Sequence, residues 1–482
     1  MDTKNLLAHV AKFGLPAPDH PDIPRYVQHR DGFTQLAQSL ANGAVPIPPR
    51  LLHGRDRRRH IRNTIIEDHV VRMQLVPDAV RSKLDDLASD PFLFFRGTAL
   101  LFYRDLVGSD LHLPVVPVVG DVHPENFGIL PGGDGQPIFS VNDLDEAWMA
   151  PFTWDVERGA VGFGLAAQLA GAKKKKVAKV IRAFIEGYFT SIGECLEDPS
   201  RAEQRFIAAD VPKVIRPFFR KAQRDRDGFL AKRIDFESMT FREDDRTHRH
   251  PEFLDALEPA LTAYADSQDR TLTVHDLAIR QGSGTASRGL TRFWFLVEED
   301  VEELVDDQPH HLILEMKMSR ASSLEGLVPD PEGDWIPDSP AERIAMAFNA
   351  FVKDGDPYYG FTDIAGISFL VRERGPQKVN ISTGVMDKDD LRDYAEVCGR
   401  VLGIQHVRAD GAWQEARQAE QREASTSSGG QPAEPLAQRI TRAASGEVFR
   451  ADTEEFAVDY LDRLTGDYEL FREDLQRGAF GW

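Results

Sequence analysis

An acid, an amide and two further acids lie close together in the first third of the chain. Asp121 and Asn126 stand five positions apart within residues 120–128, and Asp143 and Asp145 follow in a second acidic segment. In phosphoryl transfer, one Asp orients or deprotonates the attacking hydroxyl, while an Asn and a later Asp hold Mg²⁺ on the phosphates. Mg²⁺ needs only one or two carboxylates from a protein. The spacing therefore predicts a catalytic role for Asp121 and Asn126, and a metal site at Asn126, Asp143 and Asp145.

The flanking residues indicate how these groups are positioned. Residues 113–119 are apolar and Val-rich, which predicts a short edge strand leading into the first acidic segment. Residues 131–135 predict a turn, and residues 137–141 predict the returning strand. On an extended segment Asp143 and Asp145 point to the same side. An Asx-rich turn without chemistry is the alternative, since Gly, Asp, Asn and Pro all favour turns.

A second group of candidate residues lies more than a hundred positions downstream. A glycine-rich segment, 281–289, is followed by the strand-like segments 292–297 and 311–318. Backbone amides of a glycine-rich turn can approach phosphates closely, and a Lys on a neighbouring strand can neutralise them. The residues expected to contact a nucleotide are Gly282, Ser283, Gly284, Ser287, Gly289 and Lys317. Taken alone, the same residues are equally typical of a flexible hairpin and a solvent-facing lysine.

Two other groups of residues leave choices open. Glu325 and Glu342 are both candidates for the ion pair that orients the lysine of a kinase, and the sequence does not choose between them. Four histidines were considered as metal ligands, but no Cys or spaced carboxylate set accompanies them, so they are interpreted as loop histidines: His248, His250, His310 and His311.

The acidic segments resemble a known group of enzymes. Residues 120–128, Gly-Asp-Val-His-Pro-Glu-Asn-Phe-Gly, look like the catalytic loop of aminoglycoside- and choline-kinase-like phosphotransferases, which usually reads H-G-D-x-x-x-x-N. Residues 141–147 resemble the metal-binding Asp motif of those enzymes, and residues 154–156 resemble the helix start that follows it. One departure is Val119, which stands where the enzymes usually have His.

A larger part of the chain resembles a bacterial domain-of-unknown-function family, number 2252. The similarity extends over most of the chain, and the residues that carry it are Pro91-Phe92, Phe95-Arg96-Gly97, residues 120–128, Asn142-Asp143-Leu144-Asp145-Glu146, Cys398-Gly399-Arg400, His406 and residues 460–478.

The resemblance to kinases implies a fold as well as a site. Kinases present the glycine-rich loop and the lysine before the catalytic loop, whereas this chain presents the catalytic loop first. Chain ends of compact domains often lie close together, so circular permutation is tolerated. A longer joining loop costs only about 0.6 kcal/mol per doubling of its length. We therefore expect an α+β, protein-kinase-like two-lobed fold with permuted lobe order and a helix-rich large lobe. In such a fold we expect Lys317 to approach Asp143 across one cleft. The alternative is that the two groups of residues serve separate functions.

Helices are expected at 67–107, 156–268, 391–407 and 453–475, and most strands at 270–381. This element pattern divides the expected fold into four regions. They are an N-terminal extension, 1–66; a large-lobe-like catalytic region, 67–268; a β-rich small-lobe-like region, 269–385; and a helical C-terminal region, 386–482, with a polar insertion at 410–435.

Composition limits the classes of function. A formal net charge of −20 argues against a nucleic-acid-binding protein, because phosphate backbones require a basic face. The basic run at 55–62 is interpreted as a solvent-exposed helix face, with reception of an anionic substrate as the alternative. Cys195 and Cys398 cannot form a disulfide framework, and no signal peptide or long apolar run is evident, so we expect a cytoplasmic protein that does not bind membranes.

The leading functional expectation is an ATP- and Mg²⁺-dependent phosphotransferase that acts on a hydroxyl of an unidentified small molecule or protein. One alternative is a nucleotide-binding pseudokinase that serves as an interaction module. Another is an enzyme of the same fold that transfers AMP. The sequence identifies neither the acceptor nor the correct alternative.

Overall fold

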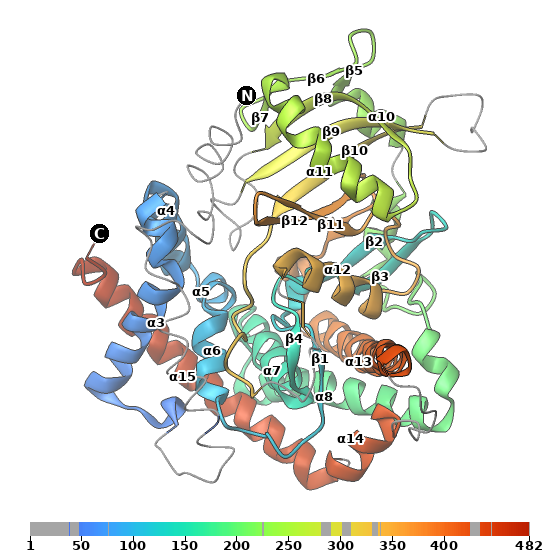
Figure 1. Ribbon diagram of the computed structural model, residues 1–482. Coiled ribbons are helices and arrows are strands. Elements are labelled where there is room, and N and C mark those ends of the chain that lie inside the picture. Colours follow the sequence, from blue (N-terminus) through green and yellow to red (C-terminus); the bar gives the residue numbers. More distant parts are fainter. Residues whose placement is uncertain are drawn as a thin grey trace.

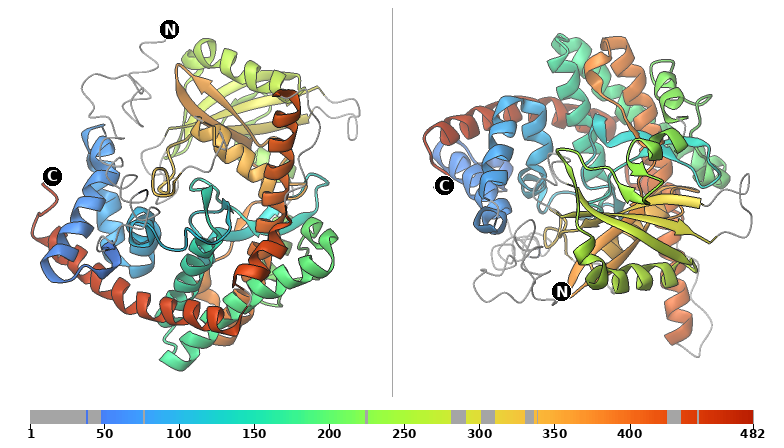
Figure 2. Two further views of the ribbon diagram at one scale, coloured as in Figure 1. Left: turned by 60° about the horizontal axis from the view of Figure 1, so that its bottom comes forward. Right: turned by 90° about the horizontal axis from the view of Figure 1, so that it is seen from above.

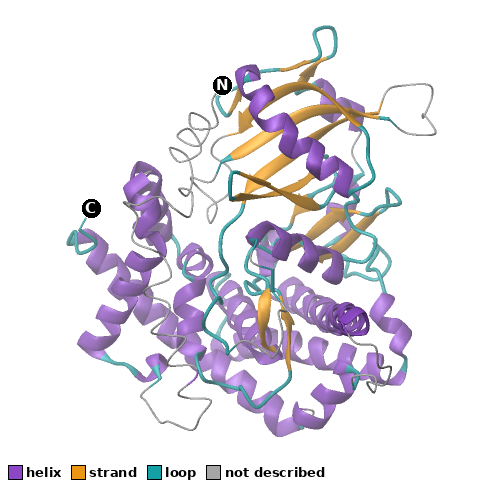
Figure 3. Cartoon of the chain, viewed as in Figure 1, coloured by secondary structure: helices purple, strands orange, loops and turns teal. Residues whose placement is uncertain are grey.

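The structure is a computed structural model of the chain, and it combines a β-rich part with a helix-rich part (Figure 1, Figure 3). It describes residues 38, 48–75, 77–223, 226–280, 291–300, 310–329, 336–337, 339–424, 434–444 and 446–481. The α+β class expected from the sequence is confirmed.

Helices of 3 to 22 residues precede the acidic segments, as the sequence predicts for residues 67–107. They are η2 (Pro49–Leu51), α3 (Gly54–Leu75), α4 (Pro77–Ser89), α5 (Pro91–Gly97) and α6 (Ala99–Leu106). The break before α5 has a local cause, because the Asp90 side chain accepts hydrogen bonds from the backbone N–H groups of Phe92 and Leu93 and Pro91 occupies the first helical turn.

Two small sheets carry the acidic segments. β1 (Val115–Val118) pairs with β4 (Trp148–Pro151), and β2 (Phe127–Pro131) pairs with both β3 (Pro137–Val141) and β13 (Val379–Asn380). A short turn, η3 (Pro124–Asn126), leads into β2. The predicted edge strand, turn and returning strand are thereby confirmed.

A group of helices packs against these sheets. It consists of α7 (Phe152–Leu169), α8 (Lys174–Glu197), α13 (Lys388–Ala424), α14 (Leu436–Ala444) and α15 (Glu447–Gln476), which are long except for α14. The group packs against the sheets through α7 and α13. α8 and α13 cross where each has a glycine: a Cβ on Gly187 would lie 2.1 Å from the Glu396 carbonyl oxygen, and one on Gly399 would lie 2.1 Å from that of Phe184. The Cys-Gly-Arg motif at 398–400 therefore marks a backbone-to-backbone helix contact.

The predicted polar insertion at 410–435 is only partly correct. Helix α13 continues to Ala424, and Asp410 is buried and accepts a 2.6 Å hydrogen bond from Arg439. The alanine- and glutamine-rich composition of this segment, which suggested a linker, is equally suited to a helix. Residues 425–433 lie outside the described part of the chain.

A six-stranded antiparallel sheet forms the β-rich part, in the order β11-β12-β10-β9-β8-β7. Its strands are β7 (Thr247–Arg249), β8 (Leu272–Arg280), β9 (Arg292–Glu299), β10 (His310–Met318), β11 (Gly360–Ile364) and β12 (Ile367–Glu373). One face packs against α11 (Leu254–Ser267), which lies in front of the sheet in Figure 1, and α12 (Pro340–Phe351) lies between the sheet and the helical part. Figure 2 shows the same layering from two other directions.

Several short elements connect the two parts. They are η4 (Pro199–Glu203), α9 (Arg216–Ala222), α10 (Arg226–Ala231), β5 (Ile234–Asp235), β6 (Thr240–Phe241), η5 (Pro251–Phe253) and η7 (Thr383–Val385). Three of the strands fall within 156–268, where helices were expected. Strands of two or three residues show no period-2 alternation, so hydrophobic patterning cannot reveal them. Three of the histidines interpreted as loop residues likewise lie in strands: His248 in β7, and His310 and His311 in β10.

The basic run at 55–62 is largely an internal contact rather than a solvent-exposed face. Arg57 is buried and pairs with Asp105 at 2.6 Å and with Asp467 of α15. Arg58 and Arg62 both pair with Asp474 of the same helix. Acids more than 400 positions away neutralise these arginines, which no local pattern shows.

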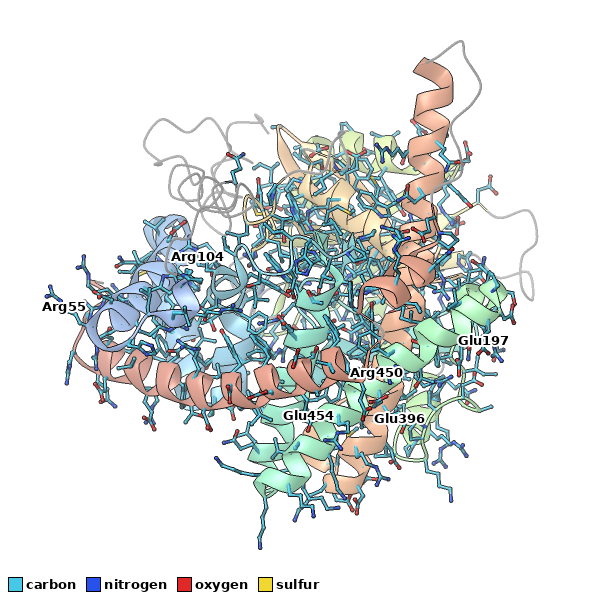
Figure 4. The ribbon with its side chains drawn as sticks, turned by 90° about the horizontal axis from the view of Figure 1, so that it is seen from below. Arg55, Arg104, Glu197, Glu396, Arg450 and Glu454 are labelled. Atoms are coloured by element: carbon cyan, nitrogen blue, oxygen red, sulfur yellow. The ribbon has the colours of Figure 1, made fainter. Side chains whose placement is uncertain are left out.

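Further ion pairs fasten α15 across the helical layer. In Figure 4, Arg450 and Glu454 are labelled on this helix where it crosses α8. Arg450 pairs with Glu186 at 2.7 Å, and Glu454 pairs with Arg182 at 2.8 Å. Within the described ranges, no helix is both long and apolar enough to span a bilayer.

Candidate active site

Asn126 joins the two acidic segments. Its Nδ2 group donates to the backbone carbonyls of Asp121, at 3.0 Å, and Asp143, at 2.9 Å. Its Oδ1 atom accepts from the backbone N–H of Asp143 at 2.9 Å. The side chain is buried, so each of these bonds is protected from water. An amide oxygen has two lone pairs, and the one left on Oδ1 is compatible with the predicted metal role.

Asp121 is held by an arginine that the sequence interpretation missed. Its Oδ1 atom accepts from Arg158 Nε at 2.9 Å and from Nη2, and His123 Nε2 lies 3.6 Å from Oδ2. The Arg158 guanidinium also lies over the ring of Phe95, 4.2 Å from its centroid. Burial raises the pKa of the Asp121 carboxyl, while the charge of Arg158 opposes this effect. Arg158 stands one helical turn after Asp155, which is the only local signal for it.

Asp155 anchors the start of the first acidic segment. Its carboxylate accepts from the backbone N–H groups of Val119, at 2.6 Å, and Gly120, at 3.0 Å. His406 Nε2 lies 3.0 Å from the same carboxylate, and its Nδ1 lies 3.0 Å from the Tyr188 hydroxyl. The backbone at position 119 is therefore anchored without the histidine that kinase-like enzymes have there.

Only glycine fits at position 120. The backbone of Gly120 has φ +79°, and a Cβ there would lie 2.1 Å from the carbonyl oxygen of Glu146. The first acidic segment thus passes in direct contact with the second one.

Lys317 of β10 reaches the second acidic segment from the six-stranded sheet. Its ammonium forms an ion pair with Asp145, which lies 172 positions earlier in the chain. Both side chains are largely buried, with 5% and 22% of their surfaces exposed. Burial would raise the pKa of Asp145, but the charge of Lys317 holds that pKa below its usual range.

The partner of Lys317 differs from the ones considered from the sequence. The ion pair shown for Lys317 is with Asp145, rather than with Glu325 or Glu342. We expected the lysine to approach Asp143, and it contacts the acid two positions further on. Asp143 is exposed and has no ion pair among the described residues.

A second set of contacts holds the backbone around Asp145. Arg343 of α12, which is buried, donates to the carbonyl oxygens of Asp145, at 2.9 Å, and Ala147. Glu146 pairs with Arg320 and accepts from the backbone N–H of Ser323. Neither Arg343 nor Arg320 was predicted, because each acts on a segment far away in sequence.

Buried charge continues along the sheet face that carries Lys317. Glu315, two positions before it on β10, accepts from Arg372 at 2.7 Å and from Arg292 at 3.1 Å. Burial alone would raise the pKa of Glu315, but these arginines hold it well below its usual range. The sequence is compatible with Arg372 either at the connection between the two lobes or as a surface charge, and the structure shows it buried.

A small pocket lies where the sheet meets the second acidic segment. Its lining includes Asn142, Tyr359, Arg372 and Lys378. Lys378 donates to the Asn142 carbonyl oxygen at 2.8 Å. Burial, with a smaller contribution from the charge of Arg372, lowers the pKa of Lys378 to about 7. The pocket thus offers cationic and aromatic groups next to Asp143.

Five of the predicted nucleotide contacts cannot be placed. Gly282, Ser283, Gly284, Ser287 and Gly289 lie outside the described residues. In the chain they fall between β8 and β9, and β9 is the neighbour of the strand that carries Lys317.

The arrangement brings acids and cations to one place. Asp121, Asn126, Asp143 and Asp145 come from the helical part, and Lys317 comes from the sheet. Carboxylate and amide oxygens suit Mg²⁺, and fixed cations suit phosphate oxygens. Such a set can bind a metal-complexed polyphosphate and orient a hydroxyl.

Comparison with known proteins identifies a family. Searches of curated proteins and of solved structures found no significant match. The family described as "Uncharacterized protein conserved in bacteria (DUF2252)" matches residues 73–474, which include every described residue of the candidate site. The chain belongs to this family.

Proposed function

We propose that this protein is an ATP- and Mg²⁺-dependent phosphotransferase that acts on a hydroxyl group, with a protein-kinase-like arrangement of its two parts in permuted order. The observation that carries the proposal is the ion pair between Lys317 and Asp145. It joins the lysine of one predicted motif to the acid of the other, and each motif alone lacks a group that phosphoryl transfer requires.

The proposed roles follow from the contacts of each side chain. Asp121, oriented by Arg158, accepts the proton of the attacking hydroxyl or positions it. Asp143, which is exposed, and the remaining lone pair of Asn126 hold Mg²⁺. Lys317 exchanges Asp145 for a phosphate oxygen when nucleotide binds. Asp145 is then free to serve as an auxiliary metal ligand.

One observation favours the pseudokinase alternative. Two guanidinium hydrogen bonds engage Asp121, and these weaken a carboxylate as a base. In that case the protein binds nucleotide and turns over none. AMP transfer remains an alternative on the same site, since it needs the same metal and phosphate contacts.

Radiolabelled ATP separates the three activities. Purified protein is incubated with Mg²⁺ and ATP labelled at the γ or the α phosphate, together with a bacterial metabolite extract and a protein extract as acceptor sources. Label from the γ position supports phosphoryl transfer, and label from the α position supports AMP transfer. Binding of ATP without either label supports the interaction module.

A matched pair of variants ties the result to this site. Lys317→Met removes the cation that joins the two parts, whereas Lys174→Met removes an exposed lysine of α8, with 94% of its side chain accessible. If Lys317→Met transferred label as fast as Lys174→Met and the wild type, the proposed site would be wrong.

A further inference from the structure

Three side chains outside the candidate active site meet on neighbouring strands of the six-stranded sheet. His275 of β8, Glu298 of β9 and His311 of β10 each offer one ligand atom, and these atoms all lie within 4.8 Å of one another. Oε2 of Glu298 lies 3.2 Å from His275 Nε2 and 3.4 Å from His311 Nε2. The carboxylate therefore lies between the two imidazoles.

Strand register explains why the three side chains converge. Glu298 is the direct cross-strand partner of His311. On the other side, the register of β8 against β9 shifts at His275: Val274 pairs with Val297 and Asp276 with Leu296. His275 is the extra residue of this β-bulge. A bulge bends a strand and redirects a side chain, and here the redirected side chain reaches Glu298.

This cluster is separate from the candidate active site. His311 and Lys317 lie on the same face of β10, six positions apart. At about 3.3 Å per residue, this places them roughly 20 Å from each other. Figure 3 shows β10 running through the middle of the sheet, so the two sites lie toward opposite ends of one strand.

The cluster is partly accessible, and no other charged group pairs with it within the part of the chain that the structure describes. The side chains of His311, His275 and Glu298 are 15%, 23% and 39% exposed. Among the described residues, Glu298 forms ion pairs only with these two histidines. His310, the neighbour of His311, contacts other groups, namely Tyr358 and Arg226.

From this geometry we propose that His275, Glu298 and His311 form a binding site for a divalent transition-metal ion, Zn²⁺ in the first place. Ligand atoms about 2.1 Å from a tetrahedral Zn²⁺ are separated by roughly 3.4 Å. Two contacts of the cluster already match this value. Imidazole selects Zn²⁺ and its transition-metal neighbours over Mg²⁺ and Ca²⁺, which take oxygen ligands. Two imidazoles and one carboxylate leave a fourth position for water or an external ligand.

Metal binding here would tie three strands together at the end of the sheet remote from Lys317. Its ligand set differs from the all-oxygen set proposed for Mg²⁺ at Asn126, Asp143 and Asp145. The two proposals can therefore fail independently.

Titration with metal tests the site without reference to enzymatic activity. The full-length protein, stripped with a chelator and free of affinity tags, is titrated with Zn²⁺ by calorimetry and with Co²⁺ by visible absorption. We expect one site per chain and the absorption of low-coordinate Co²⁺. Loss of a group outside the first ligand shell already costs 10–100-fold in metal affinity, so His275→Ala and His311→Ala should each weaken binding by about 100-fold or more.

Matched variants separate this site from non-specific binding to surface histidines. His310→Ala removes the adjacent imidazole and should bind Zn²⁺ as the wild type does, while Glu298→Gln should bind weakly. Zn²⁺ should raise the melting temperature of the wild type and of His310→Ala, but not that of His275→Ala. Circular dichroism confirms that each variant is folded. Equal Zn²⁺ affinity of the wild type and His275→Ala, or no tight site in the wild type, would overturn the proposal.

Discussion

The acidic loops and the sheet face that meets them hold buried charge in different ways. In the loops, polar side chains such as Asn126 and Asp155 bind the backbone and leave acids in place around them. On the sheet, Glu315 and its arginines bind each other directly. The backbone of the loops is therefore held by neutral and charge-assisted hydrogen bonds, whereas the sheet face is held by ion pairs between side chains. The loops contain such pairs as well, between Asp121 and Arg158 and between Glu146 and Arg320.

Because of this difference, the loops and the sheet contribute different features to the candidate site. Backbone anchoring fixes loop geometry and leaves carboxylates such as Asp143 exposed for a ligand. Ion pairing along a strand keeps its cations in fixed positions. Lys317 is the point of contact, because it belongs to the sheet and pairs with the loops. The substitutions below test the acidic loops and the ion pair between Lys317 and Asp145 that joins them to the sheet.

The largest expected effect is on catalysis by the loop part. Asp121→Asn keeps the shape of the side chain but removes the base and its pairing with Arg158. If the protein is a phosphotransferase, label transfer from γ-labelled ATP should fall by about 10²–10⁴ while nucleotide binding stays nearly unchanged. The control is Asp134→Asn in the exposed turn between β2 and β3, which should retain the wild-type rate. Unchanged transfer by Asp121→Asn would remove this residue from the mechanism.

Next in size is the stability that the loop anchor provides. Asn126→Ala removes three buried hydrogen bonds and leaves their backbone partners unsatisfied, so the free energy of unfolding should fall by about 3 kcal/mol. Asn142→Ala is the matched control: among the described residues that side chain donates a single 3.3 Å bond, to Asn380, so its loss should cost less than about 1 kcal/mol. Urea denaturation measures both values. Equal losses would show that the loops are not held by Asn126.

A smaller effect is expected at the contact between the two parts. Lys317→Met leaves Asp145 unpaired in a largely buried place and should lower the free energy of unfolding by about 2 kcal/mol at neutral pH. The pKa of Asp145 is depressed in the folded protein. The ion pair therefore contributes its full stabilisation to the folded protein above the ordinary Asp pKa of about 4, and this contribution is lost as the pH falls through the depressed pKa.

The wild type and Lys317→Met should therefore differ most in stability near neutral pH and least in strong acid. Without the lysine, the charge that most lowers the pKa of Asp145 is gone, so this pKa is higher in the variant than in the wild type and the stability difference shrinks as the pH falls. Urea midpoints measured across this pH range test the expectation. A difference that grows on acidification would contradict the ion pair as the source of stability.

The smallest expected difference separates the two acids of the second segment. Asp143→Ala should weaken Mg²⁺-dependent ATP binding about tenfold more than Asp145→Ala does, a difference of about 1.4 kcal/mol. The reason is that Asp143 is exposed and unpaired among the described residues, whereas Asp145 is engaged by Lys317. Calorimetric titration of both variants measures the difference. A stronger effect of Asp145→Ala would move the metal site two positions along the chain.

Local pattern determined much of the framework. The apolar run at 115–118, the turn at 131–135 and the strand at 137–141 are short-range signals, and each appears as expected. The helices predicted at 391–407 and 453–475 both form, but the first continues to Ala424 through residues that were expected to be a polar insertion. The sequence also singled out Asp121, Asn126, Asp143 and Lys317, because their side chains can do chemistry and their spacing is unusual.

Tertiary structure alone decided which of these groups have partners. Arg158, Arg343 and Lys378 act on segments 37 to 236 positions away, so no window of sequence links them to their partners. The same holds for His275, Glu298 and His311, whose convergence depends on strand register and one bulge. Ion pairs and hydrogen bonds form only between groups that are close in space. For residues far apart in sequence, that proximity arises from the packing of helices and strands against one another.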